Sequence, residues 1–98
     1  MADTIPDVNI TSTAYTNINT ESGISVGTAL ILQNKSNSNM FVQIAASQPD
    51  ADSTDGLHLY TAPYTLSILQ ITAGETNPVW VRSAGFSPQN DLSVQQGV

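Results

Sequence analysis

Short runs of alternating apolar and polar residues recur along this chain, separated by clusters of Asn, Ser, Gly and Pro. This pattern is typical of the strands of a β-sandwich or barrel. No window repeats apolar residues at helical spacing over three turns, so evidence for helices is nearly absent. The predicted strands are Asp7–Ile10, Gly27–Gln33, Met40–Ala46, Leu57–Thr61, Thr65–Thr72, Val79–Arg82 and Leu92–Gln95.

The alternation also predicts which side chains face the core. Four strands give a simple pattern in which alternate apolar residues share one face. The side chains expected on the inward or shared faces are Val8 and Ile10, Val42 with Ile44 and Ala46, Val79 and Val81, and Leu92 and Val94. Leu57 and Leu59 are likewise expected to point inward, with His58 and Tyr60 outward.

Two strands depart from simple alternation. Gly27–Gln33 is apolar on both faces, which indicates a central strand covered on two sides. The Asn- and Ser-rich stretch after it reads as a turn, so this strand and Met40–Ala46 are expected to form a hairpin. In Thr65–Thr72 the apolar phase shifts by one residue, as a β-bulge would produce.

Together these patterns predict an all-β fold, a small antiparallel β-sandwich or β-barrel of about six to eight short strands. Residues 1–20 are polar and weakly patterned, and we expect them to form an extended N-terminal arm. Residues 21–98 are expected to form a single β-domain, consistent with the usual size of a domain.

Composition narrows the classes of function. Of 98 residues, 37 are Ser, Thr, Asn or Gln, whereas Lys35 and Arg82 are the two basic residues, and the net charge is −6. Nucleic-acid binding and binding to anionic membranes both depend on basic residues, so neither is expected. The N-terminal sequence lacks the pattern of a secretory signal, and the longest strongly apolar stretch, Ala29–Leu32, is too short to span a membrane.

Gly23–Gly27 reads G-x-S-x-G, the pattern around the nucleophile of α/β-hydrolases. That chemistry needs Ser25 at a turn from a strand into a helix, and here a strand is expected to follow. His58, the one His, lies between two Leu residues and is expected on the outer face of a strand. We therefore expect no catalytic residue, no enzymatic activity and no cofactor.

Asp50, Asp52 and Asp55 lie on one loop that ends at Gly56. Clustered carboxylates of this kind are weak candidates for a Ca²⁺ site, because Ca²⁺ binds six to eight oxygen atoms. Their spacing does not fit an EF-hand, and the sequence lacks the distal Glu of that motif. A solvated turn in which the Asp side chains cap backbone N–H groups is the favoured interpretation, with no metal site.

Aromatic and apolar side chains outside the predicted core are candidates for contacts with another protein. Trp80 and Tyr60 face away from their strands' inward residues, and Arg82 shares the face of Trp80. A second core layer is the favoured interpretation for these aromatic residues, and contact with a partner is the alternative. The candidate interface residues are Tyr60, Tyr64, Trp80, Arg82, Phe86, Ile5 and Val8.

Several stretches of the chain resemble a family of small structural proteins of bacteriophage virions, similar to capsid decoration (cement) proteins or head and tail accessory proteins. The likeness covers about residues 15–95 and consists of strand and turn patterns without a catalytic signature. The stretches are Thr20–Leu30, Ile31–Lys35, Phe41–Gln43, Ala46–Pro49, Ala73–Glu75, Val79–Ser83 and Leu92–Gln95. Residues Tyr60–Gln70 fit the pattern less well.

The resemblance implies a β-sandwich or β-barrel that forms a homotrimer and binds the major capsid protein or other virion proteins. The implied location is the virion, assembled in the host cytoplasm, and the implied role is decoration and stabilisation of the capsid exterior. The alternative is a tail, fibre or head-fibre module that makes adaptor contacts or recognises host glycans.

Overall fold

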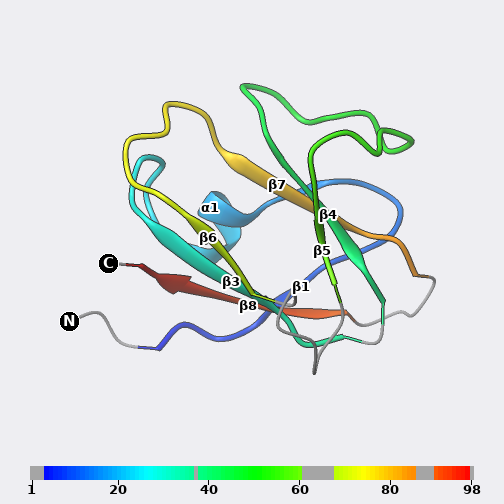
Figure 1. The fold of residues 1–98 in the computed structure, drawn as a ribbon, viewed down its shortest axis with the longest axis horizontal. Helices are drawn as coiled ribbons and strands as arrows, with labels where there is room; N and C mark the ends of the chain where they lie inside the picture. Colours follow the sequence, from blue (N-terminus) through cyan, green and yellow to red (C-terminus); the bar gives the residue numbers. More distant parts are fainter. Residues whose placement is uncertain (1–3, 37, 61–67, 86–89, 98) are drawn as a thin grey trace.

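The computed structural model describes residues 4–36, 38–60, 68–85 and 90–97, and these form mostly β structure with one short helix (Figure 1). Each element is short, in keeping with the small spacing between turn signals in the sequence. The elements are β1 (Val8–Asn9), β2 (Thr16–Asn17), α1 (Ile18–Ser22), β3 (Leu30–Asn34), β4 (Met40–Ile44), β5 (Leu57–Leu59), β6 (Ile68–Ile71), β7 (Val79–Ser83) and β8 (Asp91–Gln96).

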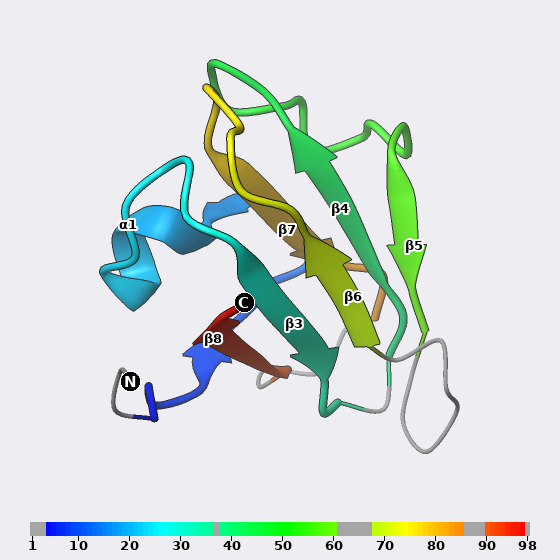
Figure 2. The ribbon, with the colours of Figure 1, turned by 60° about the vertical axis from the view of Figure 1, so that its left-hand side comes forward.

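The strands form two four-stranded antiparallel sheets packed face to face. One sheet has the order β1-β8-β3-β6 and the other has the order β2-β7-β4-β5. Figure 2 shows the two sheets as separate layers, with α1 beside one end. The predicted all-β sandwich is confirmed, and the described strands do not close into the alternative barrel.

The core lies between the two sheets and follows the predicted alternation. Val79 and Val81 of β7 are buried, as are Leu92 and Val94 of β8. The registers place these residues beside apolar partners of the central strands, Val42 opposite Val81 and Leu32 opposite Val94. Alternate residues therefore supply the two inner faces, as a two-layer sandwich requires. The other buried apolar residues are Val8, Ile10, Tyr15, Ile18, Ile24, Ala29, Leu30, Met40, Leu59 and Ile71.

Strand β3 is internal to its sheet, as predicted, but it is not covered on two sides. Its outward residue Ile31 is half-buried and pairs with Gln70 on β6 and Gln95 on β8. Two long polar side chains thus flank Ile31 on the outer face. The aliphatic stem of a long polar side chain can cover neighbouring apolar surface, which fits the partial burial of Ile31.

The predicted hairpin of β3 and β4 is wrong, because the two strands belong to different sheets. The chain crosses between the layers after Asn34, whose fully buried side chain links them. Its Nδ2 donates hydrogen bonds to the carbonyl oxygens of Ser38 (2.7 Å) and Leu59 (3.1 Å), and Leu59 belongs to the opposite sheet. Apolar alternation shows which face is inward but not which sheet a strand joins.

Residues 4–20, expected to form an extended arm, are integrated into the sandwich. β1 pairs with β8 and β2 pairs with β7, so this segment adds an edge strand to each sheet. Ile10 and Ile18 are fully buried. Between polar neighbours, a few well-placed apolar residues are sufficient to anchor the segment.

The helix α1 was not expected from the sequence. Asn17 caps its N-terminus by accepting a hydrogen bond from the Thr20 backbone N–H, and Gly23 ends it with a left-handed φ of 78°. Asn19 then ties the helix to the sheet, because its Oδ1 accepts a hydrogen bond from the Val79 N–H at 2.9 Å. A five-residue helix is too short to show the periodicity that sequence analysis detects.

Strands β5 and β6 depart from the prediction in detail. Leu59 is buried as expected, whereas Leu57, also expected to be inward, is 53% exposed. β6 pairs with β3 in continuous register from Ile68 to Ile71, so the described part of this strand contains no bulge. The other half of the predicted shift, at Leu66, lies outside the described residues. The described helix is too short to cross a membrane.

Candidate binding groove

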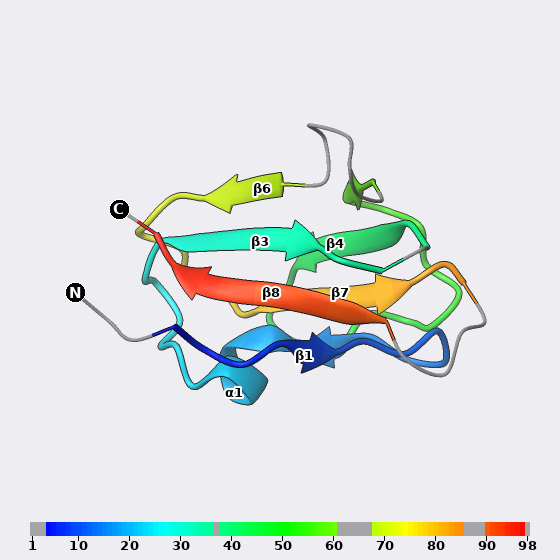
Figure 3. The same cartoon turned by 90° about the horizontal axis from the view of Figure 1, so that it is seen from below.

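In the described part of the chain, one side of the sandwich is bounded by two edge strands. β5 ends the sheet β2-β7-β4-β5, and β6 ends the sheet β1-β8-β3-β6. Figure 3 shows β6 and β5 on the same side of the molecule, opposite β1 and α1. An edge strand presents backbone N–H and C=O groups that its own sheet does not pair.

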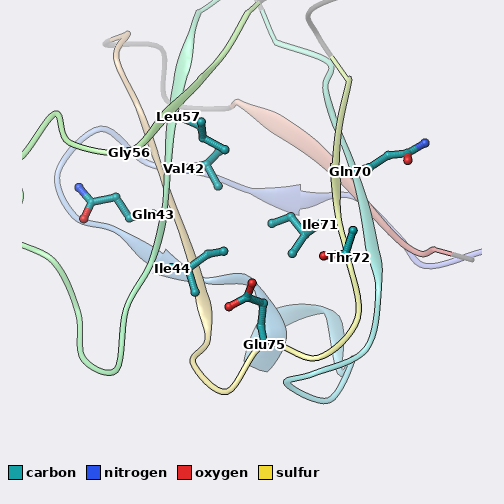
Figure 4. Close-up of a pocket in the computed structure, with 9 residues that line it drawn as sticks. All are labelled: Val42, Gln43, Ile44, Gly56, Leu57, Gln70, Ile71, Thr72 and Glu75. Atoms are coloured by element: carbon teal, nitrogen blue, oxygen red, sulfur yellow. The ribbon is translucent and has the colours of Figure 1, made fainter.

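A groove of about 460 Å³ lies between these edges. This volume falls in the range of typical ligand sites, roughly 300–1,000 Å³. Figure 4 shows the residues that line it, with those of β4 and β5 facing those of β6 and the turn after it. The lining consists of Val42, Gln43, Ile44, Gly56, Leu57, Gln70, Ile71, Thr72 and Glu75.

Much of the wall of the groove is apolar and exposed. Ile44 is 40% exposed and Leu57 is 53% exposed, while Val42 and Ile71 form a buried base. Ile68, at the start of β6, is also 51% exposed. Covering this surface with another molecule would remove apolar area from water, which is favourable by about 25 cal/mol per Å².

Glu75 is the one charged residue in the lining. It lies in the turn between β6 and β7, which is held to the turn before β3 by a hydrogen bond from the Gly74 N–H to the Gly27 carbonyl (3.0 Å). In Figure 4 its carboxylate points into one end of the groove, near Ile44 and Thr72. Leu57 and Val42 lie toward the other end.

Neither basic residue of the chain lines this groove. The Lys35 ammonium forms an ion pair with Asp7 at 2.7 Å, and this hydrogen bond, followed by the charge of Asp7, raises the pKa of Lys35. The Arg82 guanidinium lies 4.9 Å from the centroid of the Phe41 ring and 5.5 Å from that of Tyr15. Both cations therefore already have interactions within the chain.

A row of aromatic side chains crosses the outer face of the sheet β2-β7-β4-β5. The Phe41 ring lies between the Arg82 guanidinium and the His58 ring, whose centroid is 4.7 Å from its own. His58 in turn contacts Tyr60 edge-to-face at 6.2 Å. Among the interface candidates, Tyr60 and Arg82 thus lie at opposite ends of one row, and Tyr60 is 41% exposed.

The loop with three Asp residues folds over the end of this row that lies at Arg82. The Tyr15 hydroxyl donates to the Ser53 carbonyl at 2.7 Å, and Gln43 Nε2 donates to the Ser53 hydroxyl at 2.8 Å. Gln48 Nε2 donates to the Tyr15 carbonyl at 2.8 Å. These bonds explain the burial of Tyr15. Within the described part of the chain, no three His, Cys, Asp or Glu side chains are grouped as a metal site.

The remaining interface candidates differ in burial and in whether the structure describes them. Trp80 is half-buried, and its indole N–H donates to the Ala45 carbonyl at 2.9 Å. Val8 belongs to the core, and Ile5 is partly buried and packs against it. Tyr64 and Phe86 lie outside the described residues.

The G-x-S-x-G sequence forms a turn before a strand. The Thr28 N–H donates to the Ser25 carbonyl at 3.2 Å, and β3 begins two residues later, whereas a nucleophile elbow leads into a helix. Gly27 has a φ of 97°, which suits the turn. The structural context of that motif is therefore absent at Ser25.

Sequence reasoning did not identify the groove. Its lining comes from β4, β5, β6 and two turns, so it depends on which strands end each sheet. Alternation placed Leu57 in the core, although Leu57 lies at an edge. The weak fit of Tyr60–Gln70 to the family pattern was the one signal near this side of the molecule.

Comparison of the chain with protein-family models, with curated proteins and with solved structures finds no match in any of the three.

Proposed function

We propose that this chain is a structural protein of a bacteriophage virion that acts by binding other protein chains. The observation that carries the proposal is the apolar groove between the two edge strands β5 and β6. Exposed apolar surface beside unpaired strand edges is typical of a site where another polypeptide binds. The strand and turn patterns that resemble virion proteins supply the particular class.

The rest of the surface fits a protein that works by contact. Ser, Thr, Asn and Gln make up 37 of the 98 residues, and such side chains form hydrogen bonds without the desolvation cost of ions. His58, the one His, is used in ring contacts with Phe41 and Tyr60. Ser25 lies in a turn that enters a strand. These placements support a role without catalysis.

Decoration of the capsid exterior is the location that this proposal favours. A charge of −6 is compatible with the outside of a particle and would repel packaged nucleic acid on the inside. The partner is then the major capsid protein or another virion protein. Assembly as a homo-oligomer, with a trimer implied by the resemblance, would multiply the contacts of each copy.

The test is the amount of this chain in purified particles of the phage that encodes it. Particles are separated by density, and this chain and the major capsid protein are quantified across the gradient by mass spectrometry. We expect a fixed ratio between them in every fraction with filled heads, and the same ratio after tails are removed. A chain that is absent from particles, or is lost with the tails, would contradict the proposal.

A second candidate is a tail or fibre module that recognises host glycans. The exposed Tyr60 ring and its neighbour His58 favour it, because sugars stack on exposed aromatic rings while polar groups bind their hydroxyls. This candidate predicts binding on a glycan array that Tyr60→Ala abolishes and Leu57→Ala leaves intact. Capsid decoration predicts no glycan binding by the parent protein or by either variant.

A further inference from the structure

We infer that the groove between β5 and β6 binds an extended segment of another virion protein, in which two apolar side chains are followed by a Lys or Arg. The inference rests on the proposed function and specifies the partner's chemistry. It is carried by three features of the groove: its apolar base, its single carboxylate and its two flanking strand edges.

The apolar side chains of the segment are required by the base and walls. Val42 and Ile71 form the base, and Leu57 and Ile44 stand beside it with large exposed fractions. In Figure 4 these four side chains converge on the same space. A polar segment there would lose its hydration without gaining hydrogen bonds, whereas apolar side chains gain by leaving water.

The basic residue of the segment is required by Glu75. Its carboxylate points into the end of the groove near Ile44 and Thr72, and it is the one charged group in the lining. An occupant that covered this end would remove the carboxylate from water. A Lys or Arg there compensates that cost with a charge-assisted hydrogen bond.

A second copy of this chain cannot supply that cation without losing contacts of its own. Its basic residues are Lys35 and Arg82. Lys35 is bound to Asp7 at 2.7 Å, and Arg82 lies between the Phe41 and Tyr15 rings. The occupant is therefore a different chain.

The flanking edges specify an extended conformation. β6 pairs with β3 on one side, and β5 pairs with β4, so within the described ranges each of these strands is the edge of its sheet beside the groove. An added strand along such an edge gains backbone hydrogen bonds and directs every second side chain inward. The groove-facing positions thus alternate, with two apolar residues toward Leu57 and the basic residue at the Glu75 end.

The probe for this inference is a capped seven-residue peptide with Val, Val and Lys at its second, fourth and sixth positions and Thr at the others. A matched peptide replaces Lys with norleucine, which keeps the aliphatic stem and removes the charge. Amide chemical shifts of the full-length protein are followed by NMR during titration. We expect shifts at residues 42–44, 57 and 70–75, with weaker binding of the norleucine peptide.

The variant Glu75→Gln tests the contribution of the Glu75 negative charge to peptide binding, because it removes the charge and keeps the size of the side chain. We expect this variant to bind the Lys peptide about two- to fivefold more weakly and to bind the norleucine peptide unchanged, the range typical of an exposed ion pair. Glu21→Gln is the matched control, because Glu21 is an exposed carboxylate on α1 and not part of the groove lining. It should bind both peptides as the parent does.

The inference is overturned if the Lys peptide produces no shifts at about 1 mM, or shifts residues outside the groove, or binds equally before and after Glu75→Gln. Equal binding of n-hexylamine would assign the groove to a small amine and also overturn it. These outcomes are separate from failure of the proposed function. If the chain copurifies with heads but fails the peptide test, the proposed function stands and this partner is rejected. If the chain binds the peptide but is absent from heads, the groove chemistry stands and the proposed function is rejected.

Discussion

Buried Asn side chains hold the crossings of this fold together. Asn34, fully buried, lies where the chain leaves one sheet and enters the other, and it donates to the Ser38 carbonyl in the connection and to the Leu59 carbonyl in the opposite sheet. Asn19 connects α1 to β7 in a similar way. Its Nδ2 donates a hydrogen bond to the Ile24 carbonyl, and its Oδ1 accepts one from the Val79 N–H. A short amide that both donates and accepts can satisfy two backbone groups at once. The polar core residues therefore have a structural purpose.

Asn34→Ala is expected to lower the free energy of unfolding by about 1–3 kcal/mol, because it removes a donor from the carbonyl of the buried Leu59, whereas the Ser38 carbonyl still accepts from the Ser36 hydroxyl. Chemical denaturation measures the change. Gln33→Ala, on the opposite face of the same strand, is the control and should cost less than about 1 kcal/mol. Equal losses for the two variants would contradict the role assigned to Asn34.

The ion pair of Lys35 and Asp7 predicts a pH dependence. The hydrogen bond to Asp7 and then its charge raise the pKa of Lys35 above its usual 10.5. The pair therefore stabilises the folded state below about pH 10.5, and this contribution is lost as the pH rises through the raised pKa. The melting temperatures of the parent protein and Lys35→Met should differ slightly at about pH 8 and converge as the pH rises above the raised pKa of Lys35. A constant difference would assign the effect to the aliphatic stem of Lys35.

At the scale of elements, alternation was a good guide to strands and a poor guide to their partners. Val79, Val81, Leu92 and Val94 were correctly placed in the core, because period-two patterning reports the buried face directly. The pairing of β3 with β6 and β8 was missed. A hairpin and a crossing between sheets both need a short polar connection, and the buried hydrogen bonds of Asn34 that select the crossing have no sequence signature.

The same limit explains why the groove was not predicted. Its existence depends on β5 and β6 being edge strands on one side, which follows from the topology and not from local pattern. Leu57 reads as a core residue by alternation, yet among the described strands none lies beyond β5 to cover it. The aromatic row was partly anticipated, since Tyr60 and Arg82 were placed on an outer face. The contacts that join them through Phe41 and His58 required the register of three strands.

Substitution of two glycines tests how strictly the turns between these elements require a positive φ. Gly23 has a φ of 78° with open space around it, so Gly23→Ala should cost about 1–2 kcal/mol from backbone strain alone. Gly56 has a φ of 92°, and a Cβ there would collide with the Val42 carbonyl oxygen. Gly56→Ala should therefore be the more destabilising of the two by chemical denaturation. Similar losses would mean that the loop before β5 adjusts freely.

At the scale of the whole molecule, the main feature is the side of the sandwich where β5 and β6 are the edges of the two described sheets. The opposite side is occupied by β1, β2 and α1, which bury Val8, Ile10 and Ile18. On the side of β5 and β6, Ile44, Leu57 and Ile68 are left exposed around the groove. A small domain with a thin core gains stability from covering such a surface. We therefore expect the protein to be more resistant to heat when bound to its partner than alone.

The most direct test of this account is rebinding to phage heads that lack the chain. Purified parent protein and Leu57→Asp are added to such heads, and the bound fraction is measured after sedimentation. Leu57 is exposed, so its substitution should leave the fold intact, and Val26→Asp is the matched control because Val26 is exposed and not part of the groove lining. We predict that the parent protein and Val26→Asp sediment with heads and that Leu57→Asp stays in solution. Equal binding of all three proteins, or binding of none, would contradict the claim that this groove holds a virion partner.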